Sequence, residues 1–117
     1  THTKACLNID HRIVCESVLT AFRPQPNEKC KQILTFEIAS STDYGHPHVT
    51  NTFFPNIYID ISKTWPKKLQ ALKAYSSEMR DYPHSRSFKG IENSAQMNGN
   101  RVGLEYAEAF HLIRKID

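Results

Sequence analysis

Two short apolar runs, rich in β-branched and aromatic residues, set the strongest limit on the fold of this chain. They occupy residues 33–39 and 56–61, and the second alternates isoleucine with other residues, so that Ile57, Ile59 and Ile61 share one face. The first run predicts a buried strand and the second a further strand. Because helical patterns alternate with these runs, the sequence predicts an α/β layer architecture.

Two helical patterns surround the strand runs, with apolar side chains three and four residues apart. The first starts at Asp10, which we expect as N-cap or first-turn acid, and ends before Pro24. The second starts after Ser62 or Thr64 as cap and runs to about Met79. Both patterns predict amphipathic helices.

The pattern beyond residue 80 is less regular. Residues 81–87 predict a loop, residues 88–97 a further helix, and the Asn-Gly-Asn at 98–100 a break in that helix. The tail at 104–116 fits both the helical and the strand period. We expect its second half to form a closing strand.

Composition limits the class of protein. The 117 residues contain 15 Lys and Arg against 12 Asp and Glu, and 39% of them are apolar, which fits one globular domain. No window approaches the roughly 18 apolar residues of a membrane span, and scattered basic residues with a net charge of +3 do not indicate nucleic-acid binding. Three irregularly spaced cysteines predict reduced thiols in the cytoplasm.

Histidines supply the candidates for metal or ligand binding. His11 could ligate zinc because a neutral imidazole is a good zinc ligand and the neighbouring Asp10 could orient it, although a helix cap followed by an exposed histidine is the simpler interpretation. The His-Pro-His at 46–48 is expected to be a solvated loop. His84 and Arg86 could bind an anionic or hydroxyl-rich ligand, or serve in a salt bridge or helix cap.

Common catalytic motifs do not occur in the 117 residues. The sequence contains no G-x-G-x-x-G, P-loop, H-E-x-x-H or G-x-S-x-G. Glu105 and Glu108, three residues apart, are compatible with a solvated helical face, and Trp65 with packing at a helix start. The residues alone therefore predict an α/β domain with one plausible metal-ligating histidine.

Seven short segments follow one another along nearly the whole chain. They are residues 7–14 (LNIDHRIV), 20–24 (TAFRP), 36–42 (FEIASST), 54–62 (FPNIYIDIS), Lys68 with 71–78 (ALKAYSSE), 83–87 (PHSRS) and 103–110 (GLEYAEAF). In this order they resemble the C-terminal half of the LmbE/PIG-L family of zinc-dependent de-N-acetylases. The resemblance implies a Rossmann-like layered α/β fold, with residues 1–117 as the C-terminal portion of a single deacetylase domain. It also implies removal of an acetyl group from an N-acetylglucosamine-type sugar, glycoconjugate or related amide.

The resemblance also assigns roles to individual residues. His11 matches a zinc-binding histidine of the family, and Asp10 matches its acidic neighbour. Asn8 lies where some members have a histidine thought to stabilise the tetrahedral oxyanion, and an amide can still donate a hydrogen bond there.

Three residues further along the chain complete the match. His84, Arg86 and Glu105 match family motifs and are expected to bind substrate. They lie in the segments at 83–87 and 103–110.

The main departure from the family is the absence of its His-Pro-Asp-Asp motif, which carries two zinc ligands and the general base. One ligand cannot hold a catalytic zinc, so we expect a segment of a larger enzyme that is weakly active or inactive alone. A half-fold would also leave sheet edges and apolar faces open to homo-oligomerisation or to the missing N-terminal half. A non-catalytic carbohydrate-binding or interaction module is the alternative, and a structural α/β domain in which His11 only follows a cap is a third.

Overall fold

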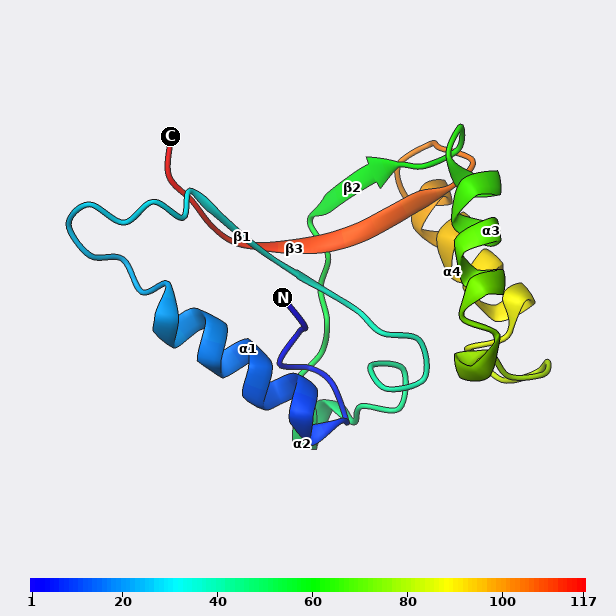
Figure 1. The fold of residues 1–117 in the computed structure, drawn as a ribbon, viewed down its shortest axis with the longest axis horizontal. Coiled ribbons are helices and arrows are strands. Elements are labelled where there is room, and N and C mark those ends of the chain that lie inside the picture. Colours follow the sequence, from blue (N-terminus) through cyan, green and yellow to red (C-terminus); the bar gives the residue numbers. More distant parts are fainter. The chain divides into compact units, whose positions relative to one another are not determined.

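The computed structural model describes residues 1–117, except for the side chain of Val49. The chain is a mixed α/β structure with a three-stranded sheet of order β1-β3-β2 (Figure 1). Its elements are α1 (Ile9–Ala21), β1 (Gln32–Phe36), α2 (Pro47–Thr50), β2 (Ile57–Asp60), α3 (Trp65–Ala74), the 3-10 helix η1 (Ser76–Glu78), α4 (Phe88–Asn100) and β3 (Ala107–Lys115). Among the helices described, none is long and apolar enough to cross a membrane.

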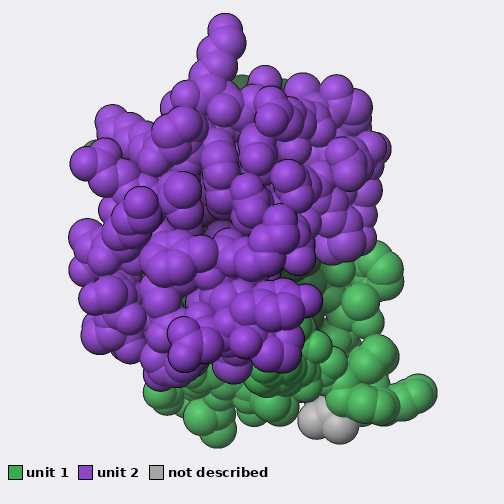
Figure 2. Space-filling model, turned by 90° about the vertical axis from the view of Figure 1, so that its right-hand side faces the viewer, with its two compact units in different colours: residues 1–57, 110–117 green, residues 58–109 purple. Residues whose placement is uncertain are grey.

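The chain divides into two compact units, which Figure 2 shows in different colours. Unit 1 contains residues 1–57 and 110–117, and unit 2 contains residues 58–109. Strand β3 contributes residues to both units.

Strand β1 pairs antiparallel with β3 in unit 1. Gln32 lies opposite Lys115 and Phe36 opposite Phe110, with a shift of register between Ile33 and Leu34. An extra residue on one strand is the usual cause of such a shift. The predicted strand at 33–39 is therefore confirmed in position, although it ends earlier.

A second pairing in unit 1 lies outside the predicted strands. His2 forms a parallel bridge with Phe36. The backbone amide of Thr3 donates to the carbonyl of Phe36, and the amide of Phe36 donates to the carbonyl of Thr1, both at 3.1 Å. Helix α1 connects the two paired segments in sequence. Two parallel segments joined through a helix have the connection of a βαβ unit.

Helix α1 lies where the sequence predicted a helix and ends at Ala21, three residues before Pro24. Its only buried residue is Cys15, whereas Ile9 and Ile13 are 61% and 54% exposed. The apolar spacing thus produces a helix whose apolar side chains lie largely in solvent.

Substitution of Ile13 by lysine tests whether these exposed side chains cause self-association. Exposed contiguous apolar surface promotes contacts between molecules, so Ile13→Lys is expected to reduce the apparent mass measured by light scattering at high protein concentration. Thr20→Lys, which adds the same charge at another exposed position of α1, is the matched control. An identical effect of both variants would assign the change to charge instead.

The core of unit 2 forms around Trp65 at the start of α3. Ile61, Trp65 and Ala95 are buried, and Ile91 and Tyr106 pack against them. The rings of Trp65 and Tyr106 stack with centroids 4.8 Å apart and an interplanar angle of 4°. The structure thereby confirms Trp65 as a packing residue.

Helix α4 corrects one sequence prediction, because it continues through 98–100 to Asn100. Asn98 and Gly99 are buried, and a Cβ on Gly99 would lie 2.6 Å from the carbonyl oxygen of Leu104. The backbone that follows α4 therefore approaches Gly99 so closely that a side chain would not fit there, and the helix continues through this glycine. The chain reverses direction at Gly103, whose φ of +76° favours glycine.

Three other boundaries differ from the sequence prediction. Helix α3 ends at Ala74 and is followed by η1 rather than continuing to Met79. The short helix α2 lies in a segment expected to be loop, and β3 begins at Ala107, so the strand occupies more of the tail than its second half. Non-local pairing of β3 with β1 settles the ambiguous period of the tail.

Removal of the Trp65 ring is expected to destabilise unit 2. Trp65→Ala deletes a buried aromatic side chain and should cost about 3–5 kcal/mol of unfolding free energy, measured by urea denaturation followed through near-ultraviolet circular dichroism. Tyr75→Ala, at a side chain that is 67% exposed, should change it by less than about 1 kcal/mol. Equal losses would contradict this assignment of the core.

Candidate functional site

Asn8, Asp10 and His11 lie together where α1 begins. Asn8 is the N-cap, because its side-chain Oδ1 accepts a 2.9 Å hydrogen bond from the backbone amide of Asp10. Asp10 is therefore the first-turn acid rather than the cap. Its carboxylate is exposed and lies at the end of the helix where the macrodipole favours negative charge.

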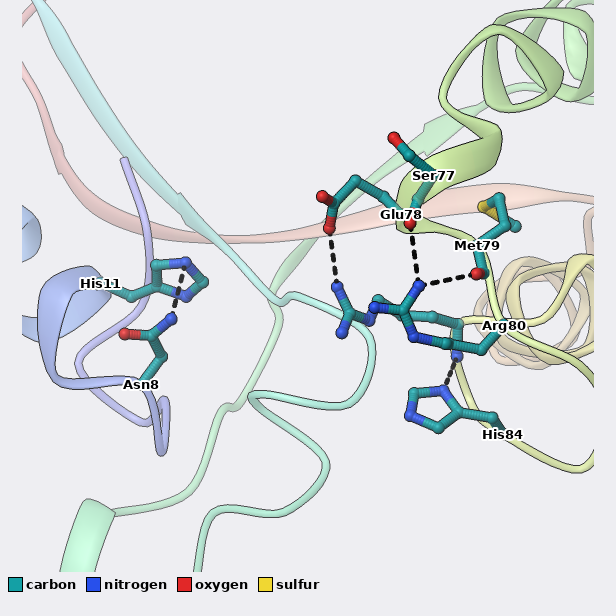
Figure 3. A network of polar contacts seen from close by, with 8 residues as sticks. Asn8, His11, Ser77, Glu78, Met79, Arg80 and His84 are labelled. Carbon is teal, nitrogen blue, oxygen red and sulfur yellow. Dashed lines mark hydrogen bonds and ion pairs between the residues drawn. The ribbon is translucent and has the colours of Figure 1, made fainter.

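The ring of His11 has a polar side chain at each nitrogen. Nδ1 lies 3.1 Å from Sγ of Cys6, and Nε2 lies 3.5 Å from the side-chain nitrogen of Asn8, as Figure 3 shows. His2 stacks on one face, with ring centroids 4.0 Å apart and an interplanar angle of 1°. Burial, followed by the charge of His11, holds the pKa of His2 below its ordinary value.

This cluster follows the carboxyl end of the parallel pair between residues 1–3 and β1. The loop after the first segment leads to Asn8, and the loop after β1 returns beside it, because the amide of Leu7 donates a 2.8 Å hydrogen bond to the carbonyl of Ser41. Ligands of α/β proteins commonly bind outside the carboxyl ends of parallel strands. The local fold thus places His11 in a position that suits a ligand-binding residue.

A cavity of about 230 Å³ lies among the loops of unit 1. Its lining combines carboxylates, hydroxyls, an amide and an aromatic ring, including Ala5, Glu37, Thr42, Asp43, Asn51 and Phe53. Ala5 precedes Cys6 in sequence. Such a lining offers hydrogen-bonding groups and one apolar surface to a hydroxyl-rich molecule.

His84 and Arg86 lie in the loop before α4, in unit 2. Nδ1 of His84 accepts a 3.0 Å hydrogen bond from the backbone amide of Arg86, and the guanidinium of Arg86 forms a 3.2 Å ion pair with Glu78. Ser87, not His84, caps α4 through the amide of Gly90. Arg86 thus has the salt-bridge role left open by the sequence.

Glu105 is exposed and precedes β3 in unit 2. Asn8, Asp10 and His11 belong to unit 1, whereas His84, Arg86 and Glu105 belong to unit 2. In the first set, Asn8 contacts both the imidazole of His11 and the backbone amide of Asp10. In the second set, His84 and Arg86 share one loop.

Sequence reasoning missed two sets of contacts. The first is the contact of Cys6 and His2 with His11. The second is the ion pair between Lys68 of α3 and Glu108 of β3, which borders a cavity of about 250 Å³ in unit 2. Lys68 and Glu108 are 40 residues apart, so no local spacing could indicate their pairing.

An imidazole can serve as a zinc ligand, but Nε2 of His11 would have to exchange its 3.5 Å contact with the side-chain nitrogen of Asn8 for the metal. Within the described part of the chain, however, no group of three or more His, Cys, Asp or Glu side chains is arranged to hold a metal ion. The histidines at 46 and 48 have a local role, since Nδ1 of His46 caps α2 by accepting from the amide of His48.

Substitutions at Asn8 separate its cap from its donor group. Asn8→Ala removes the cap and should lower the unfolding free energy by about 1 kcal/mol. Asn8→Asp keeps an oxygen acceptor for the amide of Asp10 and should retain most of that stability. Urea unfolding of both variants measures the difference, and equal losses would argue against the cap.

Comparison with known proteins gave no match for this chain, whether to family models, to curated proteins or to solved structures.

Proposed function

We propose that this chain is the C-terminal segment of a zinc-dependent N-deacetylase of the LmbE/PIG-L type, acting on an N-acetylated amino sugar, glycoconjugate or related amide in the cytoplasm. The observation that carries the proposal is the environment of His11. Its ring lies in the first turn of α1, its Nδ1 contacts Cys6 and its Nε2 faces the amide of Asn8.

The fold of unit 1 supports the same proposal. Two parallel paired segments with α1 between them are the kind of unit from which a Rossmann-like fold is built. His11 and Asn8 follow the carboxyl end of the first paired segment, where such folds bind their ligands. We therefore propose an incomplete Rossmann-like domain, with its remaining strands outside the 117 residues.

Zinc would supply Lewis-acid polarisation of the amide carbonyl and a water of lowered pKa. His11 would hold it through Nε2, and because a catalytic zinc takes three protein ligands, the other ligands and the general base would come from a segment outside these residues. The amide of Asn8 would donate to the developing oxyanion. The negative charge of Asp10 would help to orient the neighbouring His11.

Substrate contacts in unit 2 are part of the proposal. The imidazole of His84 and the guanidinium of Arg86 would bind oxygen atoms of the sugar or of its substituent, and Glu105 would accept hydrogen bonds from its hydroxyls. For Arg86 this requires exchange with Glu78, a surface pair in which the glutamate is 64% exposed. Exposed ion pairs contribute little to stability, so such an exchange costs little.

A carbohydrate-binding module without catalysis is the second candidate. The observation that favours it is the cavity of unit 1, which combines Glu37, Asp43 and Asn51 with the ring of Phe53. Such a module would bind N-acetylglucosamine without zinc. Zinc dependence of binding therefore distinguishes the two candidates.

Zinc content of the longest natural form of the protein tests the deacetylase. We expect about one zinc per chain by elemental mass spectrometry, with release of acetate from an N-acetylglucosaminide. His11→Ala should remove both, whereas His48→Ala, which alters an exposed histidine, should remove neither. Unchanged zinc in His11→Ala would refute the proposed ligand, and sugar binding without zinc would favour the module.

A further inference from the structure

The sulfur of Cys6 lies within hydrogen-bond distance of the His11 ring. Cys6 is fully buried, and its Sγ lies 3.1 Å from Nδ1 of His11. Either the thiol donates to an unprotonated Nδ1, or a protonated Nδ1 donates to the sulfur. The two arrangements place the second nitrogen, Nε2, in opposite states, since a neutral imidazole carries one proton.

The amide of Asn8 shows which of these arrangements is present. Its Oδ1 accepts from the backbone amide of Asp10 at 2.9 Å, which fixes the side-chain orientation and turns the NH₂ group towards Nε2 of His11, at 3.5 Å. An NH₂ group only donates. A proton on Nε2 would set two donors against each other, so Nε2 carries the lone pair and Nδ1 carries the proton.

Two further contacts hold the ring and the loop that carries Cys6. His2 stacks parallel on the His11 ring, which limits rotation out of its plane. The guanidinium of Arg12 donates to the carbonyl oxygens of Cys6, at 2.8 Å, and Leu7, at 2.6 Å. The sulfur is therefore fixed against the start of the helix that carries His11.

We infer that Cys6 is a positioning residue for His11. Its buried sulfur accepts a hydrogen bond from Nδ1–H, which selects one tautomer and turns the lone pair of Nε2 towards the NH₂ of Asn8, a contact that a ligand at Nε2 would replace. That the ligand is zinc rests on the proposed function, whereas the tautomer does not. Histidine ligands of metals commonly have such a partner at the second nitrogen, although a carboxylate or carbonyl is more usual than a thiol.

Long-range ¹⁵N–¹H correlation spectra of the uniformly ¹⁵N-labelled protein test the inference at a pH where the ring is neutral. We expect Nδ1 of His11 to be protonated and Nε2 to be unprotonated. Cys6→Ala should shift the ring towards the Nε2–H form that imidazole prefers in water, and Cys6→Ser, which restores an acceptor, should retain the native tautomer. Cys15→Ala is the matched control, because it removes a second buried thiol from the helix of His11.

An Nε2–H ring in the unsubstituted protein would overturn the inference, even if Cys6→Ala failed to fold. An unchanged tautomer in a folded Cys6→Ala protein would also overturn it. Titration of the longest natural form of the protein with Zn²⁺ alone should perturb Nε2 of His11, with an affinity about 10–100-fold weaker in Cys6→Ala. An Nδ1–H ring that Zn²⁺ does not perturb would support the positioning role of Cys6 and contradict the proposed function.

Discussion

The backbone hydrogen bonds of strand β3 are the interaction on which most of this structure depends. The nine-residue strand pairs antiparallel with β1 over Gln32–Phe36. Its residue Phe110 and the preceding Tyr106 accept hydrogen bonds from the amides of Asn56 and Ile61, which flank β2. These partners are remote in sequence, so pairing β3 with both strands includes the entropic cost of closing long loops. Without β3, β2 would lack the neighbour that satisfies its backbone groups, and β1 would keep only its pairing with residues 1–3.

Local periodicity predicted the elements whose stability is local. Helix α1 ends before Pro24 because proline disfavours the helical conformation in the preceding residue. Asn8 and His11 lie close because side chains three residues apart share one face of a helix. The cap residue Asn8 and its contact with the imidazole of His11 both lie within the four residues 8–11.

The remaining features depend on contacts between distant residues, which a spacing pattern does not contain. Residues 1–3 have no apolar run, and only pairing with Phe36 makes them extended. Helix α4 passes through Gly99 because the backbone at Leu104 needs the space that a side chain would occupy. Cys6 reaches His11 through a loop, so its role follows from the fold rather than from a motif.

The ring of His11 has more contacts than a solvated histidine beside a helix cap would need. A solvated cap-adjacent imidazole needs no partner, and fixing its ring would cost conformational entropy without a compensating gain. Here a buried thiol contacts one nitrogen, a second imidazole covers one face and an amide of fixed orientation meets the other nitrogen. The pKa of His2, which stacks on this ring, lies below its ordinary value because of burial first and the charge of His11 second. The thiol, the second ring and the amide thus restrict the orientation of the His11 imidazole, and their contacts must offset the side-chain entropy that is lost in ordering it.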